Sequence, residues 1–321
     1  MLKLNTLSGF GSGGVGVAAI TGNGYWGGGY LVASRTAGTD KLTFATDTTA
    51  AATDANLTEV KSGAAPVSDA STNGYFVGGF TGPYAATADK LVFATDTTAA
   101  ATDADLTTPT TGSAGVSDGS TNGYVAGGTS GANVVIAEKL VFATDTMSLE
   151  ASANLSEARQ GVSGCSDGTG GNGYFAGGNS GAVSATADKL VYATDTTAAA
   201  TDADLSQARS NVTGISDGSV KGYFGGGYTG PSPSYVATTD GITFSTDTTA
   251  AVTDANLSGI RGVTGGTSQG STNGYWGGGY SGARVDIMDK LVYSTETTAA
   301  QTSANLSVAK WETSALSSVA V

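Results

Sequence analysis

The stretch GYFAGGNSGAVSATADKLVYATDT, residues 173–196, decides the fold of this chain, because versions of it occur six times. It begins with a Gly-Tyr dipeptide and a glycine pair, and it ends with a short apolar run that leads into Thr-Asp-Thr. The Gly-Tyr anchors recur every 49 to 52 residues, at residues 24–25, 74–75, 123–124, 173–174, 222–223 and 274–275. A fixed period of this length is the signature of a repeat architecture.

Two further elements complete each repeat. An Asn/Asp-Leu-Ser/Thr unit, centred on Leu205 in the fourth copy, precedes a segment such as GVSGCSDG at 161–168. Four residues after that leucine, five of the six copies carry a basic residue, whereas the second copy has Thr110. The basic residues are Lys61, Arg159, Arg209, Arg261 and Lys310.

The repeat elements have the composition of β-strands. Each is short, rich in β-branched and aromatic residues, and bounded by Gly, Asp, Asn or Ser. No segment sustains a 3.6-residue apolar period, so each repeat is expected to form a sheet of about four strands. Such a sheet cannot bury both faces alone, but six of them arranged radially can. The sequence therefore predicts an all-β, six-bladed β-propeller with four-stranded antiparallel blades, forming a single domain over residues 1–321, with its glycine pairs on crowded inner strands.

The two ends of the chain predict how the ring closes. Leu7-Ser8 aligns with Leu205-Ser206, so the first repeat begins part-way through, and a further Leu306 unit lies near the end. One blade should therefore combine strands from both termini. Both ends carry a candidate inner strand, and the sequence leaves open whether residues 1–12 or 311–321 are displaced. An open solenoid is the alternative, although its terminal repeats normally differ from the middle ones.

Charge and hydropathy exclude several kinds of partner. The net charge is −13, with 14 Lys and Arg against 27 Asp and Glu, and no two basic residues are adjacent. Binding to nucleic acid or to an anionic membrane surface requires clustered basic residues, so neither partner is expected. No apolar stretch approaches the roughly 20 residues that span a bilayer. Residues 1–20 lack a continuous apolar region and make a poor secretory signal.

The sequence also lacks the usual catalytic sets. It contains no His, and its only cysteine, Cys165, is expected to be a small buried residue. The acidic residue after each apolar run, such as Asp195, should form a salt bridge or cap a turn. Asp96, Asp103 and Asp105 supply carboxylates of the kind that calcium prefers, but the equivalent of Asp103 in the next copy is Ser152. We therefore expect no enzyme activity, no cofactor and no metal site, with a glycosidase using acidic residues near the axis as a remote alternative.

Candidate binding residues lie in the segments that vary most among the copies, between the glycine pair and the Asp-Lys run. All six segments should lie on one rim, where loops on a rigid scaffold usually bind partners, although unselected drift of loops is the alternative. The candidates are Tyr30, Arg35, Tyr84, Tyr228, Tyr235, Tyr280 and Arg284. The recurring tyrosines are instead expected to be the structural core of the repeat, packing between blades: Tyr25, Tyr75, Tyr124, Tyr174, Tyr223 and Tyr275.

The repeat resembles kelch. The run GYFAGG at 173–178 is similar to the kelch double glycine, and KLVYATDT at 189–196 to the kelch strand that ends in a Tyr-Asp turn, although the usual Trp after the third strand is missing. GYFGGGYTG at 222–230 together with DLSQAR at 204–209 also resembles propeller-like proteins encoded by marine and freshwater bacteriophages, over about 300 residues.

The resemblance to phage proteins implies a virion structural protein on a tail, fibre or capsid surface. Such an acidic protein would present variable loops for receptor binding, adhesion or protein–protein interaction, with other virion proteins, copies of itself or a host-surface glycan as partners. The alternative is a cellular kelch-type binding module or lectin, in the cytoplasm or outside the cell.

Overall fold

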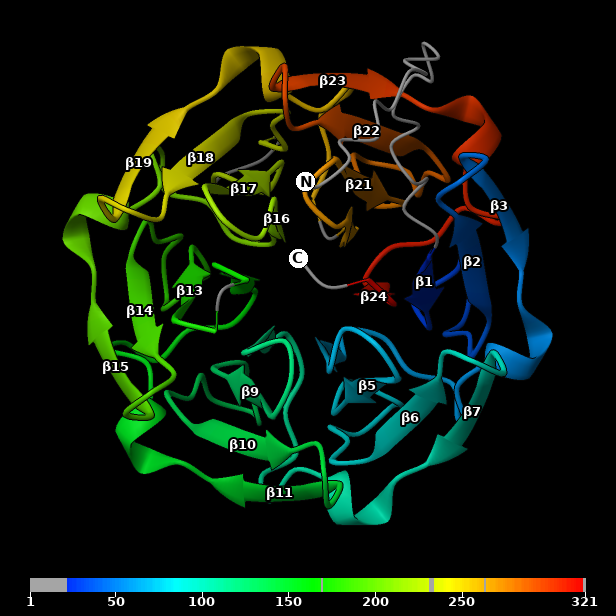
Figure 1. Ribbon diagram of the computed structural model, residues 1–321, viewed down its shortest axis with the longest axis horizontal. Coiled ribbons are helices and arrows are strands. Elements are labelled where there is room, and N and C mark those ends of the chain that lie inside the picture. The colour runs from blue at the N-terminus through cyan, green and yellow to red at the C-terminus, as the bar shows by residue number, and fades with distance from the viewer. Residues whose placement is uncertain (1–21, 169, 231–233, 263, 320–321) are drawn as a thin grey trace, which may run out of the picture.

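The chain forms a ring of six blades around a central axis (Figure 1), described by a computed structural model for residues 22–168, 170–230, 234–262 and 264–319. Every blade is a four-stranded antiparallel sheet, and the only helices among the described residues are single 3-10 turns. The predicted all-β, six-bladed propeller is therefore confirmed, and the open-solenoid alternative is wrong.

Each blade runs from an innermost strand near the axis to an outermost strand at the circumference. Blade 1 contains β24 (Ser314–Ser317), β1 (Asn23–Gly27), β2 (Thr39–Thr43) and β3 (Thr48–Ala51); blade 2 contains β4 (Ala65–Ser68), β5 (Asn73–Val77), β6 (Ala88–Val92) and β7 (Thr97–Ala100); blade 3 contains β8 (Ala114–Ser117), β9 (Asn122–Ala126), β10 (Ala137–Val141) and β11 (Thr146–Leu149). Blade 4 contains β12 (Ser163–Ser166), β13 (Asn172–Ala176), β14 (Ala187–Val191) and β15 (Thr196–Ala199); blade 5 contains β16 (Thr213–Ser216), β17 (Lys221–Gly225), β18 (Thr239–Thr243) and β19 (Thr248–Ala251); blade 6 contains β20 (Gly265–Gln269), β21 (Asn273–Gly277), β22 (Met288–Val292) and β23 (Thr297–Ala300). The 3-10 turns after the outermost strands are η1 (Thr53–Ala55), η2 (Thr102–Ala104), η3 (Ala151–Ala153), η4 (Thr201–Ala203), η5 (Thr253–Ala255) and η6 (Thr302–Ala304).

Blade 1 closes the ring with strands from both ends of the chain, as the sequence predicts. The last strand, β24, pairs antiparallel with β1, the first described strand, so that Leu316 lies opposite Tyr25. Figure 1 shows the red β24 beside the blue β1 near the axis. Residues 311–321 thus supply the innermost strand, and the competing segment, residues 1–12, lies outside the described residues.

The second strand of each blade buries both of its faces, because neighbouring blades cover it on each side. On β1, Tyr25 stacks on Phe93 of blade 2, with ring centroids 5.6 Å apart. The next residue, Trp26, points the other way and donates its indole N–H to the carbonyl of Gly265 in blade 6, at 3.0 Å. Both side chains are fully buried. Two buried faces explain why the strand sequences do not alternate between apolar and polar residues.

A tyrosine, a lysine and an acidic residue form a clamp between each pair of blades. In blade 4, Tyr174 and Lys189 are cross-strand partners and both reach Asp247, at the tip of the β18–β19 turn in blade 5. Lys189 Nζ lies 2.8 Å from the carboxylate of Asp247, which is itself in the left-handed region at φ 54°. The six acidic members are Asp47, Asp96, Asp145, Asp195, Asp247 and Glu296. They form the expected salt bridges, and each lies in the left-handed region of its turn, but their carboxylates bond the preceding blade rather than cap the turn.

The clamps shift the ionisation of their members. Burial raises the pKa of Tyr174 well above its ordinary value, and the hydrogen bond to Asp247 raises it further. Burial alone would raise the pKa of Asp247, but hydrogen bonds from Lys189 and Tyr174 outweigh it and hold this pKa below the usual range. Each clamp therefore favours a neutral phenol and a charged carboxylate.

Blade 5 keeps its clamp although its sequence changes. Gly241 stands where other blades have the clamp lysine, opposite Tyr223. Lys221, two residues before Tyr223 on the same face of β17, supplies the cation instead and lies 2.6 Å from Glu296 of blade 6. The displaced cation and the longer carboxylate preserve the same inter-blade contact.

A second ion pair lies inside five of the blades, where the basic residue of each repeat enters the following blade. Arg209 is fully buried and pairs with the buried carboxylate of Asp240 at 2.5 Å. Its guanidinium also donates to the carbonyl oxygens of Gly226 and Thr238. The equivalent pairs are Lys310–Asp40, Lys61–Asp89, Arg159–Asp188 and Arg261–Asp289.

Blade 3 replaces this ion pair with neutral donors. Thr110 occupies the position of the cation, and the buried Glu138 accepts hydrogen bonds from the backbone N–H groups of Thr107 and Thr108. Ser113 donates to the carbonyl of Gly127, the role that an arginine Nη1 plays in blades 4 and 5. The longer acidic side chain and the serine hydroxyl together compensate for the missing cation.

Glycine is required at two different radii. The predicted glycine pairs lie just after the second strands rather than on the innermost ones: Gly178 has a φ of 111° and donates its N–H to the carbonyl of Arg209 at 2.9 Å. The crowded positions near the axis are occupied by other glycines on the innermost strands. One is Gly115 on β8, where a Cβ would collide with the carbonyl oxygen of Pro66 on β4. Backbone contacts between blades thus exclude side chains at both radii.

Candidate functional site

The six variable segments occupy equivalent places in the six blades. Each connects the second strand to the third, and all blades share one strand direction, so the segments emerge on the same side of the ring. Within each segment two residues pair across a tight loop, and the first also pairs with a residue just before the innermost strand. From blade 1 to blade 6 the loop pairs are Tyr30–Arg35, Phe80–Tyr84, Thr129–Asn133, Asn179–Val183, Tyr228–Tyr235 and Tyr280–Arg284.

On four consecutive blades these positions form a continuous aromatic arc, here called the rim crescent. It consists of Tyr228 and Tyr235 from blade 5, Tyr280 and Arg284 from blade 6, Trp311, Tyr30 and Arg35 from blade 1, and Phe80 and Tyr84 from blade 2. The closest ring pair, Tyr280 and Trp311, has centroids 5.0 Å apart. Tyr84 is the most open member, with 36% of its surface exposed.

The two arginines join the rings into one surface. The guanidinium carbon of Arg284 lies 5.2 Å from the Tyr30 ring centroid and 5.7 Å from that of Trp311. Arg35 lies on the same tyrosine at 5.2 Å and covers Phe80 at 4.3 Å. Attraction between a cation and an aromatic face therefore holds both guanidinium groups in place.

The tyrosines of the crescent differ from the clamp tyrosines in their hydroxyl groups. Among the described residues, no hydrogen bond partner is found for the phenols of Tyr30, Tyr84, Tyr228, Tyr235 and Tyr280. Burial raises the pKa of Tyr235, and the neighbouring phenols of Tyr280 and Tyr228 raise it further. The crescent thus combines ring faces with hydroxyls that remain open to a ligand.

The remaining two blades carry small or polar residues at the same positions. Blade 3 has Thr129 and Asn133, and blade 4 has Asn179 and Val183. Asn133 donates its amide to the carbonyl of Asn179 at 2.7 Å, so this half of the rim is closed by its own hydrogen bond. The backbone is repeated around the ring, whereas the side chains divide the rim into an aromatic half and a polar half.

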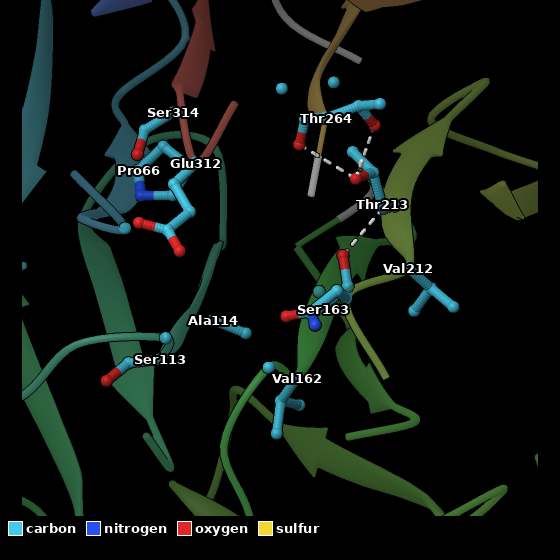
Figure 2. Close-up of a pocket in the computed structure, with 18 of the residues that line it drawn as sticks. Pro66, Ser113, Ala114, Val162, Ser163, Val212, Thr213, Thr264, Glu312 and Ser314 are labelled. Atoms are coloured by element: carbon cyan, nitrogen blue, oxygen red, sulfur yellow. Dashed lines mark hydrogen bonds between the residues drawn. The ribbon is translucent and has the colours of Figure 1, made fainter. Parts of the chain in front are cut away.

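A central cavity of about 440 Å³ opens beside the rim and is lined by all six blades. Its walls are mainly Gly, Ala, Ser and Thr from the innermost strands, and Tyr228 and Asn179 border it from the rim. Figure 2 shows Ser163 and the hydrogen-bonded hydroxyls of Thr213 and Thr264 on one side, with Glu312 and Ser314 across the cavity. The cavity is therefore lined by hydroxyl groups and small apolar groups in about equal measure, and it is continuous with the rim.

Glu312 is the one charged side chain among the described residues that line this cavity. Its backbone is in the left-handed region at φ 53°, and its carboxylate accepts a hydrogen bond from Ser62 at 2.8 Å. Glycoside hydrolysis generally uses two carboxylates that flank the scissile bond. The lining offers a single carboxylate, so the axial cavity gives the glycosidase alternative no support.

Two of the three carboxylates considered for calcium accept hydrogen bonds from other groups. Asp96 belongs to the clamp with Tyr25 and Lys41, and Asp105 accepts the backbone N–H of Ala88 at 2.7 Å. In the part of the chain that the structure describes, no three His, Cys, Asp or Glu residues are arranged to hold a metal ion. Cys165 is buried on β12, and burial raises the pKa of its thiol.

The structure brings all seven candidate loop residues into the rim crescent, and it places the six recurring tyrosines in the clamps between blades. Sequence reasoning did not select Phe80, Trp311 or Glu312. An alignment of the six copies contains the signal that would have found them. Phe80 takes the place of Tyr30. Trp311 stands where the other copies have small or polar residues, and Glu312 stands where three of the other five copies have Gly. Trp311 lies before the innermost strand rather than in a variable loop, so the search of the loops passed over it.

The chain is therefore a β-propeller whose rim has an aromatic part and a polar part. No model of a known protein family matches the chain, and no curated protein matches it. None of the helices in the described ranges is long and apolar enough to cross a membrane.

Proposed function

We propose that this protein is a non-catalytic binding component, in which a rigid propeller presents the rim crescent to a partner. The observation that carries the proposal is the division of the rim. Six equivalent loop positions on a repeated backbone hold aromatic residues and arginine on four consecutive blades and small or polar residues on the other two. Aromatic and arginine side chains are the commonest energetic anchors of interfaces.

The clamps support a binding role because they fix the blades that carry the loops against one another. A tyrosine and a lysine of each blade contact an acidic turn of the next, so the six blades are joined around the whole ring. A preorganised surface loses less conformational entropy when it binds.

We further propose that the binding component belongs to a phage particle, as a tail, fibre or capsid-surface protein. The repeat pattern GYFGGG with DLSQAR supports this assignment, since it resembles that of phage-encoded propellers. The partner at the crescent is then another virion protein, a second copy of this chain or a host-surface glycan.

Two measurements test the proposal. Antibodies against the chain should label purified particles of the phage that carries the gene, and the absence of label would exclude the virion assignment. For the crescent, a photoreactive phenylalanine analogue replaces Tyr84 in one variant and Asn133, at the same position on the polar half, in another. We expect cross-links to a particle component from position 84 alone; equal yields from both positions would refute the crescent as the binding surface.

A further inference from the structure

Among the basic residues that the structure describes, the two arginines of the rim crescent differ from the others because no acidic partner is found for them. Every other Lys or Arg that the structure describes lies within 4.0 Å of a carboxylate oxygen. Arg35 and Arg284 have none among the described residues, although the chain carries 27 acidic residues against 14 basic ones. In so acidic a protein, two unpaired guanidinium groups on one surface point to an anionic ligand.

Their hydrogen-bonding groups are also left unused. The Nε atoms of Arg35 and Arg284 and the indole nitrogen of Trp311 have no hydrogen-bond partner in the described structure, but they are shielded from solvent, as are the unpartnered Nε atoms of the ion-paired Arg159, Arg209 and Arg261. The outer N–H groups of Arg35 and Arg284 are therefore the ones that a ligand reaches, and a carboxylate can accept two parallel N–H groups of one guanidinium.

The arrangement of the arginines places two positive charges close to one aromatic ring. Both guanidinium groups lie 5.2 Å from the ring centroid of Tyr30, one contacting Phe80 and the other contacting Trp311. Aromatic rings extend the surface beyond both, to Tyr84 at one end and Tyr228 at the other. A matching ligand is an extended chain with a few carboxylates and with faces that stack on rings between them.

We propose that the rim crescent binds an acidic polysaccharide, with carboxylates on Arg35 and Arg284 and sugar rings on the tyrosines. This inference rests on the proposed binding function of the crescent and names its ligand class. Phenol groups suit a sugar because the ring face contacts C–H groups while the hydroxyl bonds sugar oxygens. Nucleic acid fits poorly, since two arginines on a protein of net charge −13 cannot neutralise a phosphate at every nucleotide.

The test measures binding to hyaluronan and polygalacturonate, each compared with the same polymer after its carboxylates have been reduced to alcohols. We expect the unmodified chain to bind at least one acidic polymer about tenfold or more tightly than its reduced form, since a charged hydrogen bond contributes about 1.5–3 kcal/mol. The double variant Arg35→Gln/Arg284→Gln should bind both forms with the same, weak affinity. Asn133→Ala, on the polar half, should bind like the unmodified chain, and thermal melting should show that all variants are folded.

The outcomes separate this inference from the proposed function. Equal binding to the acidic and reduced polymers, or no binding to either acidic polymer, would overturn the acidic-polysaccharide assignment. Cross-linking from position 84 to a virion protein, without binding to either polymer, would overturn it too and leave the binding function of the crescent intact. Loss of polymer binding in Asn133→Ala equal to that in the arginine variant would also count against it, because the two halves of the rim would then not differ.

Discussion

Replacing Arg209 with threonine should strongly destabilise the protein. The change leaves Asp240 buried without its cation, and the carbonyl oxygens of Gly226 and Thr238 lose their guanidinium donors. Of the side-chain donors to Asp240, Ser206 remains, through its hydroxyl at 2.5 Å. Breaking a buried ion pair by removing one partner costs about 3–5 kcal/mol, which lowers the folding equilibrium constant by about a hundredfold or more.

Blade 3 shows which further changes should restore stability. There the position of Arg209 is taken by Thr110, that of Asp240 by Glu138 and that of Val212 by Ser113. The triple variant Arg209→Thr/Val212→Ser/Asp240→Glu therefore gives blade 5 the polar set of blade 3. We expect it to recover about half or more of the loss, because the glutamate reaches backbone N–H groups and the serine bonds the glycine carbonyl.

Chemical denaturation measures the free energies and thermal denaturation the melting temperatures, each followed by tryptophan fluorescence and circular dichroism. The single variant should melt at least about 5 °C below the unmodified chain, and the triple variant should lie between them. The two spectroscopic probes must give coincident transitions before free energies are compared. A loss below about 1 kcal/mol in the single variant, or a triple variant no more stable than the single one, would refute this account of the buried pairs.

Three further predictions follow from the packing between blades. Gly277→Val should cost about 1–3 kcal/mol in a denaturation experiment, because a Cβ there would lie 2.7 Å from the indole nitrogen of the buried Trp26; an unchanged midpoint would contradict this packing. Stability should fall as pH rises above 10, since the clamp tyrosines have raised pKa values in the folded state and must stay protonated. It should also fall as pH drops below about 4, where carboxylates such as Asp247, whose pKa is lowered by folding, take up protons; a flat pH titration of the melting temperature would contradict both. Removing residues 311–321 should lower the melting temperature by depriving blade 1 of its innermost strand, and a synthetic peptide of those residues should restore it, whereas a truncated chain as stable as the full one would contradict closure by β24.

The repeat predicted most of the fold because the strands that pair within a blade are neighbours in the sequence. A Gly-Tyr strand, a glycine pair and an Asp-Lys strand are consecutive in the chain, and their cross-strand partners, such as Tyr174 and Lys189, lie within one repeat. Local turn residues and strand composition therefore suffice to build a blade. The sequence also predicted seven residues of the crescent, because a comparison of the six copies shows which segments vary.

Other features depend on contacts between distant residues, and no local pattern encodes them. The clamp joins residues about one and a half repeats apart, such as Tyr174 and Asp247, so its partners cannot be read from either repeat alone. The replacement of the clamp lysine by Lys221 is visible only once Glu296 of the next blade is placed beside it. Trp311 lies outside the variable loops, and its membership of the crescent follows from its ring contacts with Tyr280 and Tyr30.

The sequence by itself determined that six similar sheets form a closed ring and that the variable loops share one rim, because each sheet needs neighbours on both faces to bury its apolar residues. Only the tertiary structure decided that β24 lines the axis in blade 1, and that Arg35 and Arg284 both contact Tyr30 without an acidic partner among the described residues. The physical reason is that ring closure places residues from opposite ends of the chain side by side. Which of them then meet depends on how the blades pack, and this packing is a property of the whole ring.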